Sequence, residues 1–215
     1  MSATLEAPSA GRVKAACEQF QREYELSEQA LSELFRQYPG NHDPRHVLLK
    51  VIAVNTLHHA MIFDVEAVAR HIQEHREEID AALAAGSPEI VHRIAAISIH
   101  GRKYNFFSFA TKFCSWHNPE AYPVYDAHVD HYLWTLQKQN HFTSFLHPDL
   151  WNYPKFVGVM AAFREFHGLN AFSFKQIDNF LSLEGAPHLQ QSSAEEPSGA
   201  GAFDFFPGDS LPVQA

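Results

Sequence analysis

The chain has 215 residues, 46% of them hydrophobic and 13% aromatic, which suits one globular domain. Its formal net charge is −9, and its two cysteines, Cys17 and Cys114, stand far apart, which argues against a disulfide framework and a cysteine-based zinc site. No apolar run is long enough to span a membrane, and the polar N-terminal sequence lacks a signal peptide's hydrophobic region. We therefore expect a cytoplasmic protein without a membrane partner.

The negative charge is unevenly distributed. Residues 186–215 hold four acidic side chains and no Lys or Arg, so the remainder carries −9 + 4 = −5. Residues 90–119, the basic segment, contain no Asp or Glu but include Arg93, Arg102, Lys103 and Lys112. The overall acidity argues against a nucleic-acid partner, whereas the basic segment is a modest surface that can meet a phosphate backbone.

The first half of the chain predicts helices. We expect a charged amphipathic helix over residues 12–38, interrupted near Leu26 and Ser27. Asp43 and Pro44 then open an apolar helix that runs to residue 59, which we expect at the centre of the core, although its β-branched residues also fit a strand. A helix capped by Asp64 continues to Gly86, and a shorter one spans residues 87–99.

The second half follows the same pattern after a loop at residues 100–105. Phe106, Phe109, Phe113 and Trp116 recur at helical spacing, and further helices are predicted at residues 126–138, 147–168 and 173–183. The prediction is an all-α domain of about eight helices over residues 12–185, after a flexible segment 1–11. Residues 186–215 predict a disordered acidic tail, whose aromatic patch at 203–207 is either residual hydrophobicity or a docking motif for an unknown protein partner.

Lys112 and Asp126 are the most suggestive chemical groups in the sequence. Lys112 lies inside an aromatic helix, and Asp126 opens the next helix after a proline-containing turn. An amine that loses hydration against aromatic rings is a better nucleophile, and a nearby carboxylate can accept its proton or stabilise a cationic transition state. The alternative is a lysine whose stem covers apolar surface and an aspartate that only caps a helix.

Other kinds of chemistry find little support. The 15 histidines are densest at residues 126–131, but they fan around one helix without a metal-binding motif. Cys114 lies in an aromatic helix where a thiol usually packs, and no serine-nucleophile motif, P-loop or dinucleotide-binding motif occurs. The sequence therefore predicts no metal and no cofactor.

The segment FATKFCSWHNPEAYPVYDAHV resembles the catalytic segment of helix-hairpin-helix DNA glycosylases, especially 8-oxoguanine DNA glycosylase-like proteins. Thr111 and Lys112 match that family's Thr-Lys pair at the start of a helix, and residues 123–128 match its Pro-Val-Asp-type turn. The resemblance implies a similar all-helical fold and a DNA glycosylase, with or without lyase activity, that removes a damaged or modified base from double-stranded DNA. It also implies Lys112 as the nucleophile on the sugar C1′ and Asp126 as the assisting carboxylate.

The family's glycine-rich hairpin before the lysine is absent here, and HGRKYNFFSFA stands in its place. We expect Arg102 and Lys103 to replace its grip on phosphate by side-chain charge. Base flipping requires aromatic or apolar walls, so the further candidates for contacts with DNA or the flipped base are Tyr104, Trp116, Tyr125 and His128. The alternative function is a non-catalytic helical module that binds nucleic acid or protein, for example in phage defence or a mobile element.

Overall fold

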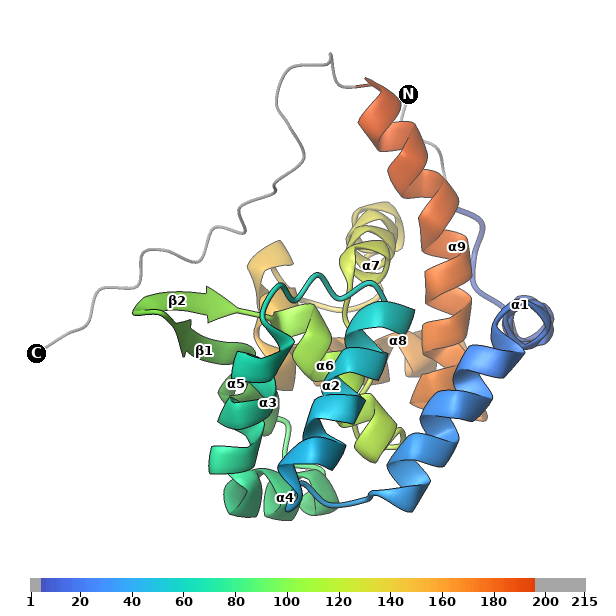
Figure 1. The fold of residues 1–215 in the computed structure, drawn as a ribbon. Coiled ribbons are helices and arrows are strands. Elements are labelled where there is room, and N and C mark those ends of the chain that lie inside the picture. Colours follow the sequence, from blue (N-terminus) through green and yellow to red (C-terminus); the bar gives the residue numbers. More distant parts are fainter. Residues whose placement is uncertain (1–4, 196–215) are drawn as a thin grey trace, which may run out of the picture.

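The computed structural model describes residues 5–195, and the side chains of residues 5–185. Its elements, in chain order, are α1 (Ala10–Gln37), α2 (Pro44–Leu57), α3 (Val65–Glu74), α4 (Arg76–Ala85), α5 (Ile90–Ala95), β1 (Ala96–Ile99), β2 (Arg102–Asn105), α6 (Phe107–His117), α7 (Ala127–Asn140), the 3-10 helix η1 (His147–Trp151), α8 (Tyr153–Phe166) and α9 (Phe174–Glu195). The described part is thus mostly helical, as predicted, with nine α-helices and one β-hairpin (Figure 1). None of these helices is long and apolar enough to cross a bilayer.

Helix α6 lies at the centre of the core. Residues 109–115 of this helix are all buried, and Phe109 and Phe113 are fully enclosed. Helices α1, α2, α4 and α5 pack around it. The aromatic spacing of this segment therefore marks a core helix, and the fold holds Lys112 at a fixed place on it.

Side-chain caps set several helix ends, as the sequence predicts. The carboxylates of Asp43, Asp64 and Asp126 accept backbone N–H groups at the starts of α2, α3 and α7. Gly86 ends α4 in the left-handed conformation, with φ of 70°. Such ends depend on local chemistry, which is why the sequence reveals them.

The segment 96–105 corrects the prediction of a helix to residue 99 followed by a loop. Helix α5 ends at Ala95, and β1 and β2 pair in antiparallel fashion, with Ile99 opposite Arg102. The two turn residues, His100 and Gly101, have φ of 50° and 77°, which suits a tight two-residue hairpin turn. Ile97 and Ile99 are buried while their neighbours are exposed. This alternation of period two is typical of a strand, so the prediction of a helix over these residues is wrong. In Figure 1 the hairpin projects from the helical body.

Three helices differ from their predicted forms. Helix α1 is continuous through Leu26 and Ser27, because both of its halves pack on the domain. The predicted helix 65–85 is divided at His75 into α3 and α4. Helix α2 is buried on one face alone and exposes Leu49 and Ile52 on another, so α6 rather than α2 is the central helix.

The ends of the predicted domain also differ. Leu5 is buried and exchanges two hydrogen bonds with the Gln139 side chain, so the chain is already packed before the predicted domain start at Arg12. Helix α9 continues past the predicted end at residue 183 to Glu195. Gly185 permits this packing, because a Cβ there would lie 2.7 Å from the carbonyl oxygen of His128 on α7. The rest of the predicted tail, with the aromatic patch 203–207, lies outside the described residues.

Candidate active site

Thr111 connects α6 to the turn that precedes α7. Its hydroxyl donates to the carbonyl oxygen of Ser108 (2.9 Å), lies 3.2 Å from the carbonyl oxygen of Tyr125, and accepts the N–H of Tyr125 (3.1 Å). Tyr125 directly precedes Asp126, and Lys112 directly follows Thr111. The threonine of the Thr-Lys pair thus fixes the backbone that carries the carboxylate.

Two other helices hold the same turn. The Tyr153 hydroxyl on α8 donates to the carbonyl oxygen of Pro123 (2.8 Å), and Asp178 on α9 accepts the N–H of Val124 (2.9 Å). Burial raises the pKa of Asp178 well above its ordinary value, which favours its protonated form. Since α6, α8 and α9 each hold one residue of the turn, Asp126 is positioned by the core of the domain.

The two carboxylate oxygens of Asp126 have different partners. Oδ1 accepts the N–H groups of His128 (3.0 Å) and Val129 (3.1 Å), which caps α7. Oδ2 lies 3.6 Å from Nζ of Lys112. One oxygen is therefore structural, and the other faces the amine.

Lys112 is 7% exposed, and its Nζ is 3.4 Å from the carbonyl oxygen of His58 at the end of α2. Both contacts of the amine are longer than a strong charge-assisted hydrogen bond, so little interaction is lost if the amine moves. Phe109 and Phe113 are fully buried, and another cation, Lys50, lies 5.7 Å from the centre of the Phe113 ring.

His58 and Trp116 border the amine. Nε1 of Trp116 donates to Nε2 of His58 (2.9 Å), so the neutral imidazole carries its hydrogen on Nδ1. Burial, followed by the charges of Lys175 and Lys112, lowers the pKa of His58 to about 3. Nζ of Lys175 lies 4.6 Å from the centre of the Trp116 ring. Sequence reasoning missed His58 and Lys175, because they come from helices distant in the sequence.

The predicted DNA-contacting residues fall into two groups. Arg102 and Lys103 are exposed on β2, and neither forms an ion pair with any residue in the range 5–185. Tyr104 is half-buried beside Phe63 and Phe106, at ring-centre distances of 4.9 and 5.9 Å. These three residues share the β-hairpin.

Tyr125 and His128 are placed differently. Tyr125 is buried, its hydroxyl donates to Asp130, and it accepts from Trp151, so it belongs to the core rather than to a pocket wall. His128 lies in the first turn of α7, and its Nδ1 is buried without a hydrogen-bond partner among the described residues. Trp116 contacts the site through its side chain, which donates to His58, whereas His128 contacts it through its backbone N–H, which donates to Asp126.

A groove of about 970 Å³ lies between α1 and the end of α6, and Trp116, Lys175 and Glu28 are among its lining residues. Lys112 and Asp126 do not line this groove; they lie beyond Trp116 and His58. Among the described residues, no group of three or more His, Cys, Asp or Glu side chains is arranged to hold a metal ion.

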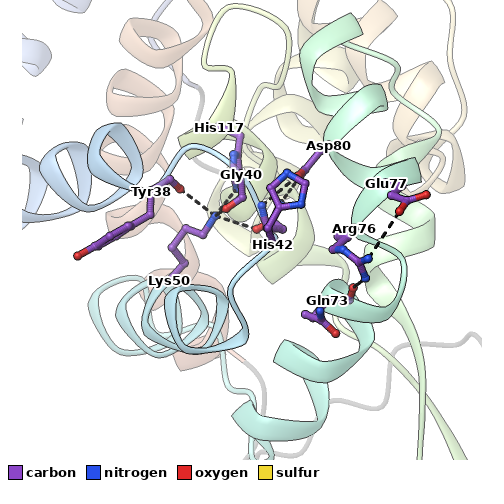
Figure 2. A network of polar contacts seen from close by, with 10 residues as sticks. Tyr38, Gly40, His42, Lys50, Gln73, Arg76, Glu77, Asp80 and His117 are labelled. Atoms are coloured by element: carbon purple, nitrogen blue, oxygen red, sulfur yellow. Dashed lines mark hydrogen bonds and ion pairs between the residues drawn. The ribbon is translucent and has the colours of Figure 1, made fainter.

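A second buried lysine, Lys50 on α2, lies in a separate network of polar contacts near the end of α6 (Figure 2). Nζ of Lys50 donates to the carbonyl oxygens of Tyr38 (3.2 Å) and Gly40 (3.0 Å) and to Oδ1 of Asn41 (2.7 Å), and lies 3.3 Å from Nε2 of His117. Asn41 in turn donates its backbone N–H to Asp80 (3.0 Å). Sequence reasoning missed this cluster, although Lys50 also stands inside an apolar helix.

Comparison with known proteins places the chain in a family. An uncharacterized protein of Haemophilus influenzae (strain ATCC 51907 / DSM 11121 / KW20 / Rd) is 36% identical over 139 residues, which is 65% of this chain and 66% of that protein. The alignment thus covers slightly less than two thirds of the relative's length. No solved structure matches the chain significantly. Residues 12–121, which include Lys112, match the family model HI_0787_N, described as an N-terminal domain. The chain belongs to the HI_0787_N family.

Proposed function

We propose that this protein is a DNA glycosylase with lyase activity, with a fold related to that of helix-hairpin-helix glycosylases, acting on DNA in the cytoplasm. The observation that carries the proposal is the separation of 3.6 Å between Nζ of Lys112 and Oδ2 of Asp126. Two groups that the resemblance names as nucleophile and carboxylate, 14 positions apart in sequence, lie face to face.

The details of the pair also fit this chemistry. A general base must lie near the proton it accepts. Oδ1 of Asp126 accepts both N–H groups that cap α7, so Oδ2 is not needed for the cap and can accept a proton from Lys112. After proton transfer to Asp126, the neutral amine can attack C1′ of the sugar. The bond from C1′ to the base breaks, and the base leaves with the bonding electrons and takes up a proton.

An enzyme-bound imine follows from the same attack. The sugar ring opens, and the nitrogen of Lys112 becomes doubly bonded to C1′. With DNA that has already lost a base, the amine condenses with the C1′ aldehyde and releases water. Borohydride adds hydride to the imine carbon and leaves a stable secondary amine that joins the protein to DNA. An unidentified target base therefore does not prevent a test.

The β-hairpin supports DNA as the partner. Arg102 and Lys103 are exposed and free of ion pairs among the described residues, so they are available to phosphate groups. In this proposal the β-hairpin, which directly precedes α6, replaces the glycine-rich hairpin of the family.

Borohydride trapping on a duplex with one abasic site tests the proposal. We expect the wild-type protein to form a covalent adduct and Lys112→Gln to form none, with an unchanged thermal midpoint. Lys175→Gln is the matched control, because Lys175 is the other amine close to Trp116 and His58. We expect this variant to keep the adduct.

Two outcomes would overturn the proposal. If the wild-type protein forms no adduct, the lysine chemistry is wrong, and the non-catalytic binding module becomes the better account. If Lys175→Gln loses the adduct and Lys112→Gln keeps it, the nucleophile has been assigned to the wrong amine.

A further inference from the structure

Three aromatic rings meet where the β-hairpin leads into α6. The ring of Phe63, from the connection between α2 and α3 (residues 58–64), lies 4.9 Å from the ring of Tyr104 and 5.9 Å from that of Phe106. The rings of Tyr104 and Phe106 are 5.9 Å apart and almost parallel. Phe63 is nevertheless 63% exposed, and the other two rings are only partly buried. These three residues, the ring cluster, form an exposed apolar surface of the kind that marks a docking site.

The fold holds Phe63 in this position. The Asn55 side chain donates to the carbonyl oxygen of Ile62 (3.0 Å) and accepts the N–H of Ile62 (2.8 Å), and Ile62 itself is buried. Met61, which is 82% exposed, has φ of 59°, a region that residues other than glycine seldom adopt. The backbone on the N-terminal side of Phe63 is therefore fixed, so the ring cluster exists before any partner binds.

A cation borders the ring cluster. In the β-hairpin, Ile99 lies opposite Arg102 and Ile97 lies opposite Tyr104, so Arg102 and Tyr104 share one face of the two strands. Arg102 is exposed and forms no ion pair with any residue in the range 5–185. An occupant that carries both aromatic rings and a carboxylate would satisfy the two parts of this surface together.

The C-terminal segment of the same chain has this composition. Residues 196–215 contain three acidic side chains and no Lys or Arg, and their aromatic patch 203–207 reads Phe-Asp-Phe-Phe-Pro. Helix α9 ends at Glu195, eight residues before Phe203. Eight extended residues span up to ~26–29 Å, whereas a compact domain of this size has a radius of gyration of ~16 Å. The aromatic patch can therefore reach surfaces well beyond the end of α9.

We propose that the aromatic patch 203–207 docks on the ring cluster of its own molecule, with Asp204 facing Arg102. Contacts between rings add to the burial of apolar area, and a carboxylate is the natural partner of a guanidinium group. A tethered segment also has a local concentration on the millimolar scale, so even a weak contact is populated. Arg102 is one of the side chains assigned above to phosphate, so the docked segment competes with DNA. This competition rests on the proposed function, whereas the docking does not.

A fluorescently labelled peptide of residues 196–215 tests the docking without DNA. The receptor is the full chain with Phe205→Ser and Phe206→Ser, whose own aromatic patch no longer fills the ring cluster. We expect fluorescence anisotropy to show saturable binding to this receptor and about tenfold weaker binding to the wild-type chain, whose tethered patch already occupies the surface. Adding Phe63→Ser to the receptor should weaken binding by about tenfold. Adding Arg102→Gln should reduce the dependence of binding on salt.

Leu26→Ser in the receptor is the matched control, because Leu26 is 81% exposed but lies on α1. This control should bind the peptide as the receptor does, and a peptide with Phe205→Ser and Phe206→Ser should not bind. Equal binding to the receptor and the wild-type chain, or no binding to either, would overturn the docking. Binding that ignores both Phe63→Ser and Arg102→Gln would place the aromatic patch on another surface and also overturn it. A wild-type dimer that the receptor substitutions dissociate would assign the contact to a second copy of the chain, against docking within one molecule.

A separate measurement tests the competition. At low salt, the receptor should bind a DNA duplex more tightly than the wild-type chain, by about threefold to tenfold. Equal binding of the duplex by both proteins would refute the competition. If neither protein binds DNA, the proposed function has failed, while the peptide titration still decides the docking.

Discussion

The two lysines buried around α6 look alike in sequence and differ in their surroundings. Each stands within an apolar helix, and each is nearly or fully removed from solvent. Lys50 donates to three oxygens at 2.7–3.2 Å, so every hydrogen of its ammonium group has an acceptor. Lys112 has two contacts, at 3.4 and 3.6 Å, one of them with a carboxylate. Burial alone does not distinguish a structural lysine from a candidate nucleophile, whereas the geometry of its acceptors does.

The difference follows from what each amine connects. The oxygens around Lys50 are the carbonyl and amide groups between α1 and α2, so this lysine holds a chain reversal in the core. Lys112 faces a capping aspartate and the start of the connection 58–64. Substitutions at Lys50 should therefore change stability, and substitutions around Lys112 should change chemistry.

The largest effect is expected at Asp126. Asp126→Asn keeps an oxygen that can cap α7 but removes the carboxylate that faces Nζ of Lys112 and that we propose as its base. We expect imine formation on abasic DNA to slow by ~10²–10⁴-fold, the scale of losing positioned acid–base help. Single-turnover trapping rates measure this change.

Asp64→Asn is the matched control for that variant. Asp64 also caps a helix, with its carboxylate accepting the N–H of Ala67. The carboxylate that faces Lys112 is that of Asp126, not that of Asp64. This control should trap DNA at the wild-type rate. If Asp126→Asn keeps the wild-type rate as well, Asp126 is only a cap, and the carboxylate has no chemical role.

The next effect is expected at Lys50. Lys50→Met keeps an unbranched stem but leaves the three buried acceptors without their donor. We expect the free energy of unfolding to fall by about 2–4 kcal/mol, measured by urea denaturation, with trapping by the folded protein unchanged. Lys112→Met should cost less than about 1 kcal/mol, because its contacts are longer. Equal losses in the two variants would contradict the distinction between the lysines.

The same variant has a pH dependence with a definite sign. Burial lowers the pKa of Lys50 from 10.5 to about 8, so between these values the unfolded chain binds more protons than the folded one. The wild-type stability relative to Lys50→Met should therefore rise with pH across this window, by at most about 1.4 kcal/mol per pH unit. A constant difference between the two proteins would mean that the amine is not desolvated.

Local rules predict much of this molecule. The caps at Asp64 and Asp126 and the stop at Gly86 follow from short-range chemistry, and the structure confirms them. These features need few contacts with distant parts of the chain, so the sequence alone reveals them. The proximity of Lys112 and Asp126 is different, because Tyr153 on α8 and Asp178 on α9 help to hold the turn before Asp126.

The remaining features depend on distant contacts. The strands of the β-hairpin have four residues each, and the side chain that packs on Tyr104 comes from the connection after α2. The exposed Met61 has no signal in the sequence, because a positive φ at a residue other than glycine is imposed by its surroundings. Lys50 could have been found, since the argument used for Lys112 applies equally to a lysine within an apolar helix.

The smallest expected effect separates the β-hairpin from the site it precedes. Arg102→Ala combined with Lys103→Ala should weaken DNA binding regardless of sequence, and should lower the dependence of the binding constant on salt by up to roughly two phosphate equivalents. Binding titrations at several salt concentrations measure both. The matched control is Lys14→Ala combined with Arg22→Ala, two exposed cations on α1, away from the β-hairpin in Figure 1. Because no described ion pair holds Arg102 or Lys103, the fold should be unaffected. An unchanged salt dependence would mean that the β-hairpin does not grip phosphate and that DNA approaches Lys112 by another surface.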